Sequence, residues 1–211
     1  MRTASTECPE VLAAAVAYAA LAHATQFRKR APDDHRPMIP YLSHLLGVAG
    51  IVIEDLGSLE EAIAGLLHDV LEDQNIKGTR APEIERLFGT DVLAIVKACS
   101  GPKKEDPGMA EFRVRKQVYL DQLLDERKIS PIRVSLADKV HNARSTVNDL
   151  ESDGPQMWKR FNAGSADQLW WYGNLAETYT AHALNGRADT ARAAELGRLV
   201  ARMRELTPTG S

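Results

Sequence analysis

Four residues of types that bind metal ions stand far apart in this chain: His44, the adjacent pair His68 and Asp69, and Asp138. The pair interrupts an otherwise apolar stretch that begins at Ala62. An unpaired charge in such a packed segment is costly or titrates to its neutral form. A divalent cation is the simplest group that would compensate. Two imidazoles and two carboxylates suit a borderline divalent transition metal and leave coordination positions for water and substrate oxygens.

Such a centre would perform hydrolysis at phosphorus. The ion would bind a phosphate oxygen and lower the pKa of a bound water toward neutrality, which produces a hydroxide nucleophile. Zinc sites in enzymes often use three protein ligands, whereas oxygen-rich octahedral coordination favours manganese. The donor types therefore leave the identity of the metal open.

Two carboxylates, Glu72 and Asp73, follow the His-Asp pair closely. Glu72 lies four residues after His68, and Asp73 lies four residues after Asp69, so a continuous helix would place each pair on one face. Negative charge at the C-terminal end of a helix opposes the helix dipole. This favours a role in the site over an ordinary acidic helix end.

A second polar patch surrounds Asp138, because His141 and Asn142 follow it at helical spacing. Two segments from distant parts of the chain, each with polar residues on an apolar face, are most economically explained by a shared site. His141 taken alone suits three roles: a core position, a residue that orients a metal ligand, or a phosphate contact.

Helical patterns dominate the elements that must position these residues. Ser58 and Glu61 form a capping box, and Ser130-Pro131 is typical of a helix start. No strand alternation, repeat or long linker is found. The predicted helices cover residues 11–30, 41–56, 58–73, 82–88, 91–99, 110–127, 130–150, 166–184 and 188–206. We therefore predict an all-α fold, a compact single domain over residues 9–206 with about eight to ten helices, in which the helices of 166–206 pack onto the rest.

Composition narrows the classes of function. The 211 residues are 44% hydrophobic and 26% charged, which is typical of a globular domain with a full core. A net charge of −3 argues against a nucleic-acid partner, although a small phosphorylated molecule needs only a local basic pocket. Cys8 and Cys99 form neither a zinc motif nor a disulfide framework, so we expect a cytoplasmic protein. We expect no secretory signal and no membrane partner, and a monomer and a homodimer both remain open.

Five ordered motifs resemble those of HD-superfamily phosphohydrolases. More narrowly, they resemble the hydrolase domain of the RelA/SpoT alarmone enzymes and the single-domain small alarmone hydrolases. The likeness spans about residues 18–150. The motifs occupy residues 22–29, 40–44, 66–73, 88–89 and 135–144.

The resemblance implies a role for each candidate residue. One Mn²⁺ ion, or another divalent transition metal, would be held by His44, His68, Asp69 and Asp138. Glu72 and Asp73 would orient or deprotonate the attacking water. The implied reaction removes pyrophosphate from the 3′ position of guanosine tetra- or pentaphosphate. The implied contacts to this small phosphorylated nucleotide are Arg28, Lys29, His141, Asn142 and Arg144.

Two alternatives remain at this stage. One is an HD-type phosphatase for another nucleotide, such as a nucleoside monophosphate or NADPH, and the other is a nucleotide-binding sensor without turnover. The family's Glu-Asp-Thr stretch ends here in Gln74, and a longer loop with His35 and Arg36 would border the base pocket. Lys103 and Lys104 suit either a solvated loop or a mobile lid. The three tryptophans, Trp158, Trp170 and Trp171, are expected to pack in or beside the core.

Overall fold

The computed structural model describes residues 7–29, 35–74, 78–103, 105–106, 108 and 110–208. Over these ranges the chain forms ten α-helices and one 3-10 helix, and no β-structure beyond an isolated bridge between Phe27 and Pro40. The predicted all-α fold is confirmed. The elements are α1 (Glu7–Ala22), α2 (Leu42–Glu54), α3 (Leu59–Leu67), α4 (Val70–Asp73), α5 (Arg80–Phe88), α6 (Thr90–Cys99), α7 (Phe112–Asp125), α8 (Ile129–Asp153), η2 (Pro155–Arg160), α9 (Ser165–Leu184) and α10 (Thr190–Glu205).

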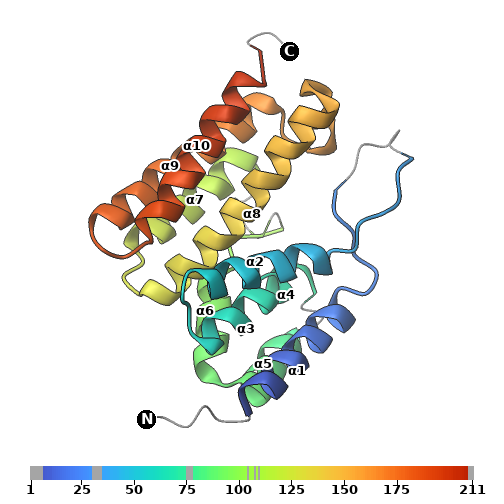
Figure 1. The fold of residues 1–211 in the computed structure, drawn as a ribbon, viewed down its shortest axis with the longest axis vertical. Coiled ribbons are helices and arrows are strands. Elements are labelled where there is room, and N and C mark those ends of the chain that lie inside the picture. The colour runs from blue at the N-terminus through green and yellow to red at the C-terminus, as the bar shows by residue number, and fades with distance from the viewer. Residues whose placement is uncertain are drawn as a thin grey trace.

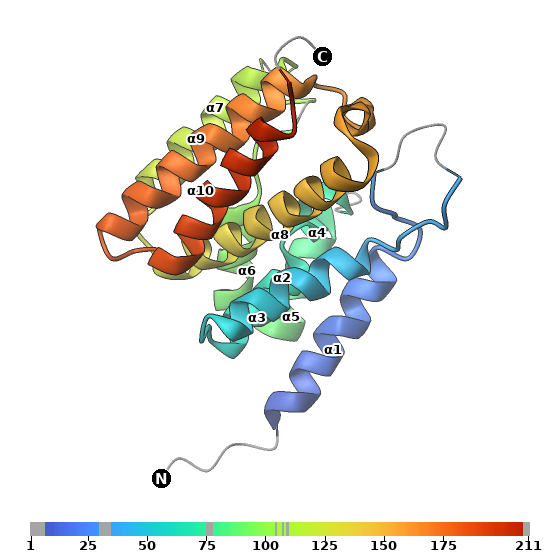
Figure 2. The ribbon, with the colours of Figure 1, turned by 45° about the horizontal axis from the view of Figure 1, so that its top comes forward.

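The long helix α8 lies at the centre of the molecule (Figure 1). Helices α2, α3 and α6 pack on one side of it, and α10 packs on the other together with α9. The same order is visible after rotation in Figure 2, where α7 lies beside α9. Helix α8 is buried from two sides because apolar residues lie on more than one of its faces, among them Ile132, Val134, Leu136, Ala137, Val140 and Ala143.

The start of α3 is fixed by the capping box predicted from the sequence. The Glu61 amide donates to Ser58 Oγ at 3.2 Å, and the Ser58 amide donates to Glu61 Oε2 at 2.8 Å. Arg133 of α8 donates to the same carboxylate oxygen at 2.6 Å. The cap therefore satisfies the first amides of α3 and also ties that helix to α8.

The predicted helix over residues 58–73 is wrong in one respect, because it is interrupted at His68 and Asp69, between α3 and α4. The Nδ1 atom of His68 lies 2.9 Å from the Gly65 carbonyl oxygen. In an uninterrupted helix that carbonyl accepts the amide of residue 69. The imidazole thus competes for the helical acceptor, and Asp69 adopts φ −93° and ψ −6°, at the edge of the helical region.

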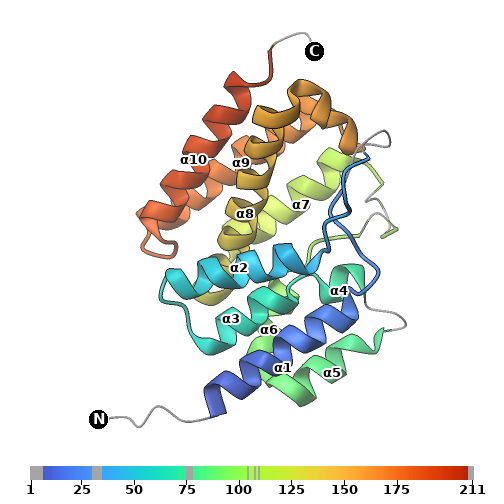
Figure 3. The same ribbon diagram turned by 45° about the vertical axis from the view of Figure 1, so that its right-hand side comes forward.

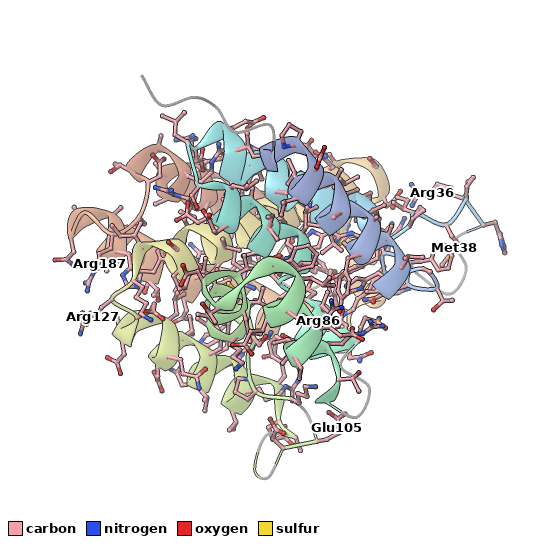
Figure 4. The ribbon with its side chains drawn as sticks, turned by 90° about the horizontal axis from the view of Figure 1, so that it is seen from below. Arg36, Met38, Arg86, Glu105, Arg127 and Arg187 are labelled. Carbon is pink, nitrogen blue, oxygen red and sulfur yellow. The ribbon has the colours of Figure 1, made fainter. Side chains whose placement is uncertain are left out.

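The first helix is also shorter than the predicted 11–30, because α1 ends at Ala22. The Arg28 amide donates to the Ile39 carbonyl at 2.9 Å, and the Tyr41 amide donates to the Gln26 carbonyl at 2.9 Å. These backbone hydrogen bonds between two segments of the same chain take the place of helical hydrogen bonds. Arg36 and Met38, just before Ile39, project from the helical body in Figure 4.

Helix α1 lies beside α5, as Figure 3 shows, and the Tyr18 hydroxyl donates to Glu83 Oε2 at 2.8 Å across that contact. In the C-terminal part of the chain, Trp158 and Trp171 are buried as expected, and Trp170 is half-buried.

Among the residues described, none of the helices combines the length and the apolar content that crossing a membrane requires.

Candidate metal centre

Three parts of the fold bring the predicted ligands together. His44 lies in the first turn of α2, the His68-Asp69 pair lies at the break between α3 and α4, and Asp138 lies in the middle of α8. His44 Nε2 is 3.2 Å from Asp138 Oδ1 and 3.7 Å from Asp69 Oδ2. His68 Nε2 is 3.0 Å from Asp69 Oδ2 and 3.6 Å from Asp138 Oδ1. The donor atoms of His44, His68 and Asp69 all lie within 4.8 Å of one another, and Asp138 Oδ1 lies beside both imidazoles.

The donor atoms fit a single cation. Two ligands each about 2.1 Å from a common ion lie about 3.0 Å apart at a right angle and about 4.2 Å apart across it. The four nitrogen-to-oxygen distances fall inside that interval. Both Nε2 atoms, of His44 and His68, are buried and lack a hydrogen-bond partner among the described residues. Buried polar atoms normally have a partner, so these two nitrogens point to an ion as the missing one.

The ring orientations leave the correct nitrogens for a metal. His68 Nδ1 donates to the Gly65 carbonyl, so in the neutral form of this ring Nε2 carries the lone pair. His44 Nδ1 lies 2.9 Å from His141 Nδ1. Of the three roles open for His141, the structure favours the one that orients a ligand. Gly47, one turn after His44, makes room for the second ring, since a Cβ there would lie 2.2 Å from His141 Cδ2 and Nε2.

Both aspartates are held by partners that the sequence analysis did not single out. The Tyr41 hydroxyl donates to Asp69 Oδ2 at 2.5 Å. Lys139 Nζ donates to Asp138 Oδ2 at 2.6 Å. Burial opposes ionisation of Asp138, but the Lys139 charge and the neighbouring His44 and His68 imidazoles together outweigh burial and hold the pKa of this carboxyl well below its usual range. Asp138 is therefore ionised.

Asn142 and Arg28 extend this arrangement outward. The Asn142 amide nitrogen donates to Asp138 Oδ1 at 2.5 Å, and its oxygen accepts from Arg28 Nη1 at 3.2 Å. Both amide atoms of Asn142 are thus used within the protein. Arg28 reaches the centre from the extended segment after α1, through Asn142.

The other predicted substrate contacts lie elsewhere. Lys29 is exposed, and its Nζ lies 5.6 Å from the centre of the Phe161 ring. Arg144 Nε donates to Glu195 Oε1 of α10 at 2.6 Å. The structure therefore places Arg144 in an α8–α10 ion pair with Glu195, and no contact joins it to the four candidate donors within the described residues.

Glu72 and Asp73 lie on α4, directly after the ligand pair. Gln26 Nε2 donates to Asp73 Oδ2 at 2.7 Å, and Gln26 Oε1 accepts from Gln74 Nε2 at 2.6 Å. Asp73 therefore has a fixed orientation, whereas Glu72 makes no hydrogen bond within the described residues. Burial, and then the Asp69 charge, raise the pKa of both carboxyls above their ordinary values.

Three residues that support the carboxylates of the site were missed by the sequence analysis, although their positions in the chain pointed to them. Tyr41, Gln26 and Lys139 all stand inside the five motifs, each close to a predicted site residue. Nothing in their residue types marked them as supports for a carboxylate. Lys104, one of the two predicted loop lysines, lies outside the described residues, whereas Lys103 Nζ donates to the Leu71 carbonyl at 3.2 Å.

Comparison with known proteins agrees with this geometry. An all-helical domain with imidazole and aspartate donors on α2, the α3–α4 break and α8 has the parts of a metal-dependent hydrolase centre. Residues 15–164 match the HD domain family, and the chain belongs to it.

Curated relatives carry more specific names. The guanosine-3′,5′-bis(diphosphate) 3′-pyrophosphohydrolase MESH1 of Xenopus tropicalis is 36% identical over 143 residues, which cover 67% of this chain and 70% of MESH1. A probable guanosine-3′,5′-bis(diphosphate) 3′-pyrophosphohydrolase of Synechocystis is 32% identical over 69% of this chain. The bifunctional (p)ppGpp synthase/hydrolase SpoT of Escherichia coli is 32% identical over 54% of it. The chain matches only 17% and 16% of those two longer proteins.

Solved structures share the fold. A structure described as a metazoan orthologue of SpoT that hydrolyses ppGpp aligns with 97% of this chain and 99% of its own, with a TM-score of 0.68 and 24% identity. The crystal structure of lmo0812 from Listeria monocytogenes aligns with 74% of this chain and 96% of its own, with a TM-score of 0.62 and 25% identity.

Proposed function

We propose that this chain is a Mn²⁺-dependent phosphohydrolase that removes pyrophosphate from the 3′ position of guanosine tetra- or pentaphosphate. The observation that carries the proposal is the 36% identity to MESH1 over most of both chains, combined with the close approach of His44, His68 and Asp69 donor atoms and of Asp138 to both imidazoles. The reaction would take place in the cytoplasm on a small phosphorylated nucleotide.

The proposed ligands are His44, His68, Asp69 and Asp138. A divalent ion bound there would supply an acidified water and would neutralise charge on a phosphate oxygen. Two imidazole nitrogens and two carboxylate oxygens leave positions for solvent, and manganese accepts such a mixed set with open positions.

The chain's own residues would accept the proton of the attacking water and hold the substrate in position. Glu72, which has no hydrogen bond to the described protein and a raised pKa, would accept the proton of the attacking water. Asp73, held by Gln26, would orient that water. Arg28 would contact the nucleotide from the extended segment beside Asn142. Pyrophosphate leaves with high negative charge, so cationic side chains near the centre would stabilise its departure.

A nucleotide panel tests the proposal. Protein loaded with Mn²⁺ is incubated separately with ppGpp, pppGpp, NADPH, GMP and AMP, and the products are identified by ion-exchange chromatography. We expect GDP and pyrophosphate from ppGpp, and GTP and pyrophosphate from pppGpp. Cleavage of NADPH or a monophosphate alone would replace the substrate assignment. Absence of turnover on a broader set of phosphate esters would favour the nucleotide-binding sensor.

A further inference from the structure

His23, the residue directly after α1, is a buried imidazole beside the metal centre that the mechanism above does not use. It is 3% exposed, and its ring stacks on Tyr41 at 5.2 Å. Its Nε2 is buried and has no hydrogen-bond partner among the described residues, whereas its Nδ1 lies 2.8 Å from Gln26 Oε1. An apolar ring would fill the same place without burying an unpartnered nitrogen. The presence of a histidine is therefore explained by the contact of its Nδ1.

That contact determines which way the Gln26 amide points. Gln26 Nε2 donates to Asp73 Oδ2 at 2.7 Å, as it must because an ionised carboxylate only accepts. Gln26 Oε1 then faces His23 Nδ1 and also Gln74 Nε2, which donates to it at 2.6 Å. A carbonyl oxygen only accepts, so His23 Nδ1 carries the proton. Two donors thus turn the amide nitrogen of Gln26 toward Asp73.

The backbone of Gln26 is fixed as well. Its amide donates to the His23 carbonyl at 3.0 Å, and its carbonyl accepts from the Tyr41 amide at 2.9 Å. The hydroxyl of Tyr41 in turn donates to Asp69 Oδ2. The turn after α1 therefore supports two carboxylates of the site, Asp73 through Gln26 and Asp69 through Tyr41.

Asp73 needs such support because its side chain is exposed on the short helix α4. An exposed side chain keeps its rotamer freedom unless a hydrogen bond restricts it. The Gln26 amide supplies the hydrogen bond that this carboxylate makes within the described residues. A group that orients an attacking water must be held to a fraction of an ångström.

We infer that His23 is a positioning residue for hydrolysis: its Nδ1–H, together with the Gln74 amide, orients the Gln26 amide, which holds Asp73 against the attacking water. The inference rests on the proposed function, because that function assigns the attacking water to Asp73. It extends that function to a buried histidine outside the four candidate donors.

Two substitutions of His23 test the inference, with Mn²⁺-loaded protein and the nucleotide that wild type cleaves fastest. His23→Phe keeps a ring to stack on Tyr41 and removes the donor, whereas His23→Asn places an amide N–H near the position of Nδ1. We expect kcat to fall about tenfold or more in His23→Phe with KM within about threefold, because a misplaced catalytic group slows the chemical step. His23→Asn should recover kcat to within about threefold of wild type, because it restores the donor.

His182→Phe is the matched control. His182 is 1% exposed, and its Nε2 donates to the Leu123 carbonyl at 2.8 Å, so this variant also removes one hydrogen bond of a buried imidazole. It should lower the melting temperature as His23→Phe does and leave kcat unchanged. Unchanged kcat in His23→Phe, the same loss in His23→Asn, or the same loss in His182→Phe would overturn the inference. Loss of manganese from His23→Phe would overturn it too, because the effect would then act through the metal ligands.

The hydrogen bond can also be measured without turnover, which decides the case if His23→Phe does not fold. Proton–nitrogen NMR spectra are recorded with Mg²⁺ in place of paramagnetic Mn²⁺, and the Gln26 side-chain amide is identified by its loss in Gln26→Glu. We expect this amide to exchange its protons with solvent more slowly than the amide of Gln156, which is exposed on η2. Equally fast exchange of the two amides would reject the inference. If the Gln26 amide is protected but no nucleotide is cleaved, the proposed function fails and the orientation of Gln26 stands.

Discussion

The Nδ1 atoms of His44 and His141 lie 2.9 Å apart, a distance at which one nitrogen donates its proton to the other. For His44 Nε2 to keep its lone pair, His44 must be the donor and His141 the neutral acceptor. Burial, and then the His44 and Arg28 charges, lower the pKa of His141 to about 4. His141 is therefore neutral near pH 7, and as an acceptor it would select the His44 tautomer whose Nε2 can bind a metal ion.

Replacement of Gly47 tests this pairing without touching a ligand. In Gly47→Ala the new Cβ would meet the His141 ring at 2.2 Å, so the ring must move away from His44. We expect a fall in manganese affinity of about 10- to 100-fold, the usual effect of losing a residue that orients a ligand. Metal titration followed by calorimetry measures it.

Gly50→Ala is the matched control, because a Cβ at Gly50 meets nothing within 4 Å. It replaces glycine in the same helix and should raise the free energy of unfolding by about 0.5–1 kcal/mol with no change in metal affinity. Equal manganese affinity in both variants would contradict the role given to His141.

Asp69→Ala removes one donor and leaves His68 and His44 Nε2 without the carboxylate that faces them. We expect loss of hydrolysis and much weaker manganese binding, measured as metal content after desalting. Undiminished activity in this variant would count decisively against the centre.

Tyr41→Phe removes the hydroxyl that donates to Asp69 and retains the ring, which stacks on His23 at 5.2 Å. The fold should persist, since the apolar contacts are unchanged. Manganese affinity or activity should fall about 10-fold or more because Asp69 loses its orienting partner. Circular dichroism and metal titration of one preparation separate a local effect from unfolding.

Glu72→Gln keeps the size of the side chain and removes the base. We expect normal manganese content and loss of most turnover, because general-base catalysis contributes about 10²–10⁴-fold. A fully active variant would remove Glu72 from the mechanism.

The rate should also depend on pH in a direction set by Glu72. Its pKa lies above the ordinary 4.5, mainly through burial and then through the Asp69 charge. Only the ionised carboxylate accepts a proton, so kcat should fall as the pH decreases through this raised pKa. The measurement is kcat against pH with manganese saturation checked at each point. A rate that stays constant down to the ordinary glutamate pKa would exclude this assignment.

The sequence sufficed for the all-α fold because helix starts, helix ends and apolar faces depend on local signals, and it also named the four candidate donors. The capping box at Ser58 determines where α3 begins, and Gly89 determines where α5 ends. The spacing of apolar residues along α8 determines which sides of that helix are buried. The four predicted donors meet because their helices pack around α8. Their role as metal ligands stays a prediction.

Other features depend on contacts that no local pattern contains. The end of α1 at Ala22 follows from the backbone pairing of Arg28 with Ile39, residues that come together only in the folded chain. The helix break at His68 follows from a side chain that takes a backbone acceptor. Arg144 carries a plausible charge for phosphate, but Glu195 from α10 engages it.

The two buried Nε2 atoms, which have no hydrogen-bond partner in the part of the chain that the structure describes, also bear on the stability of the native state. An ion that satisfies them binds the native state and not the unfolded chain, so its binding free energy adds to the free energy of unfolding. Free manganese at about 100 times its dissociation constant would add about 2.7 kcal/mol. The melting temperature should therefore rise with manganese and drop with a chelator, and scarcity of the metal would deplete the protein itself as well as slow its reaction.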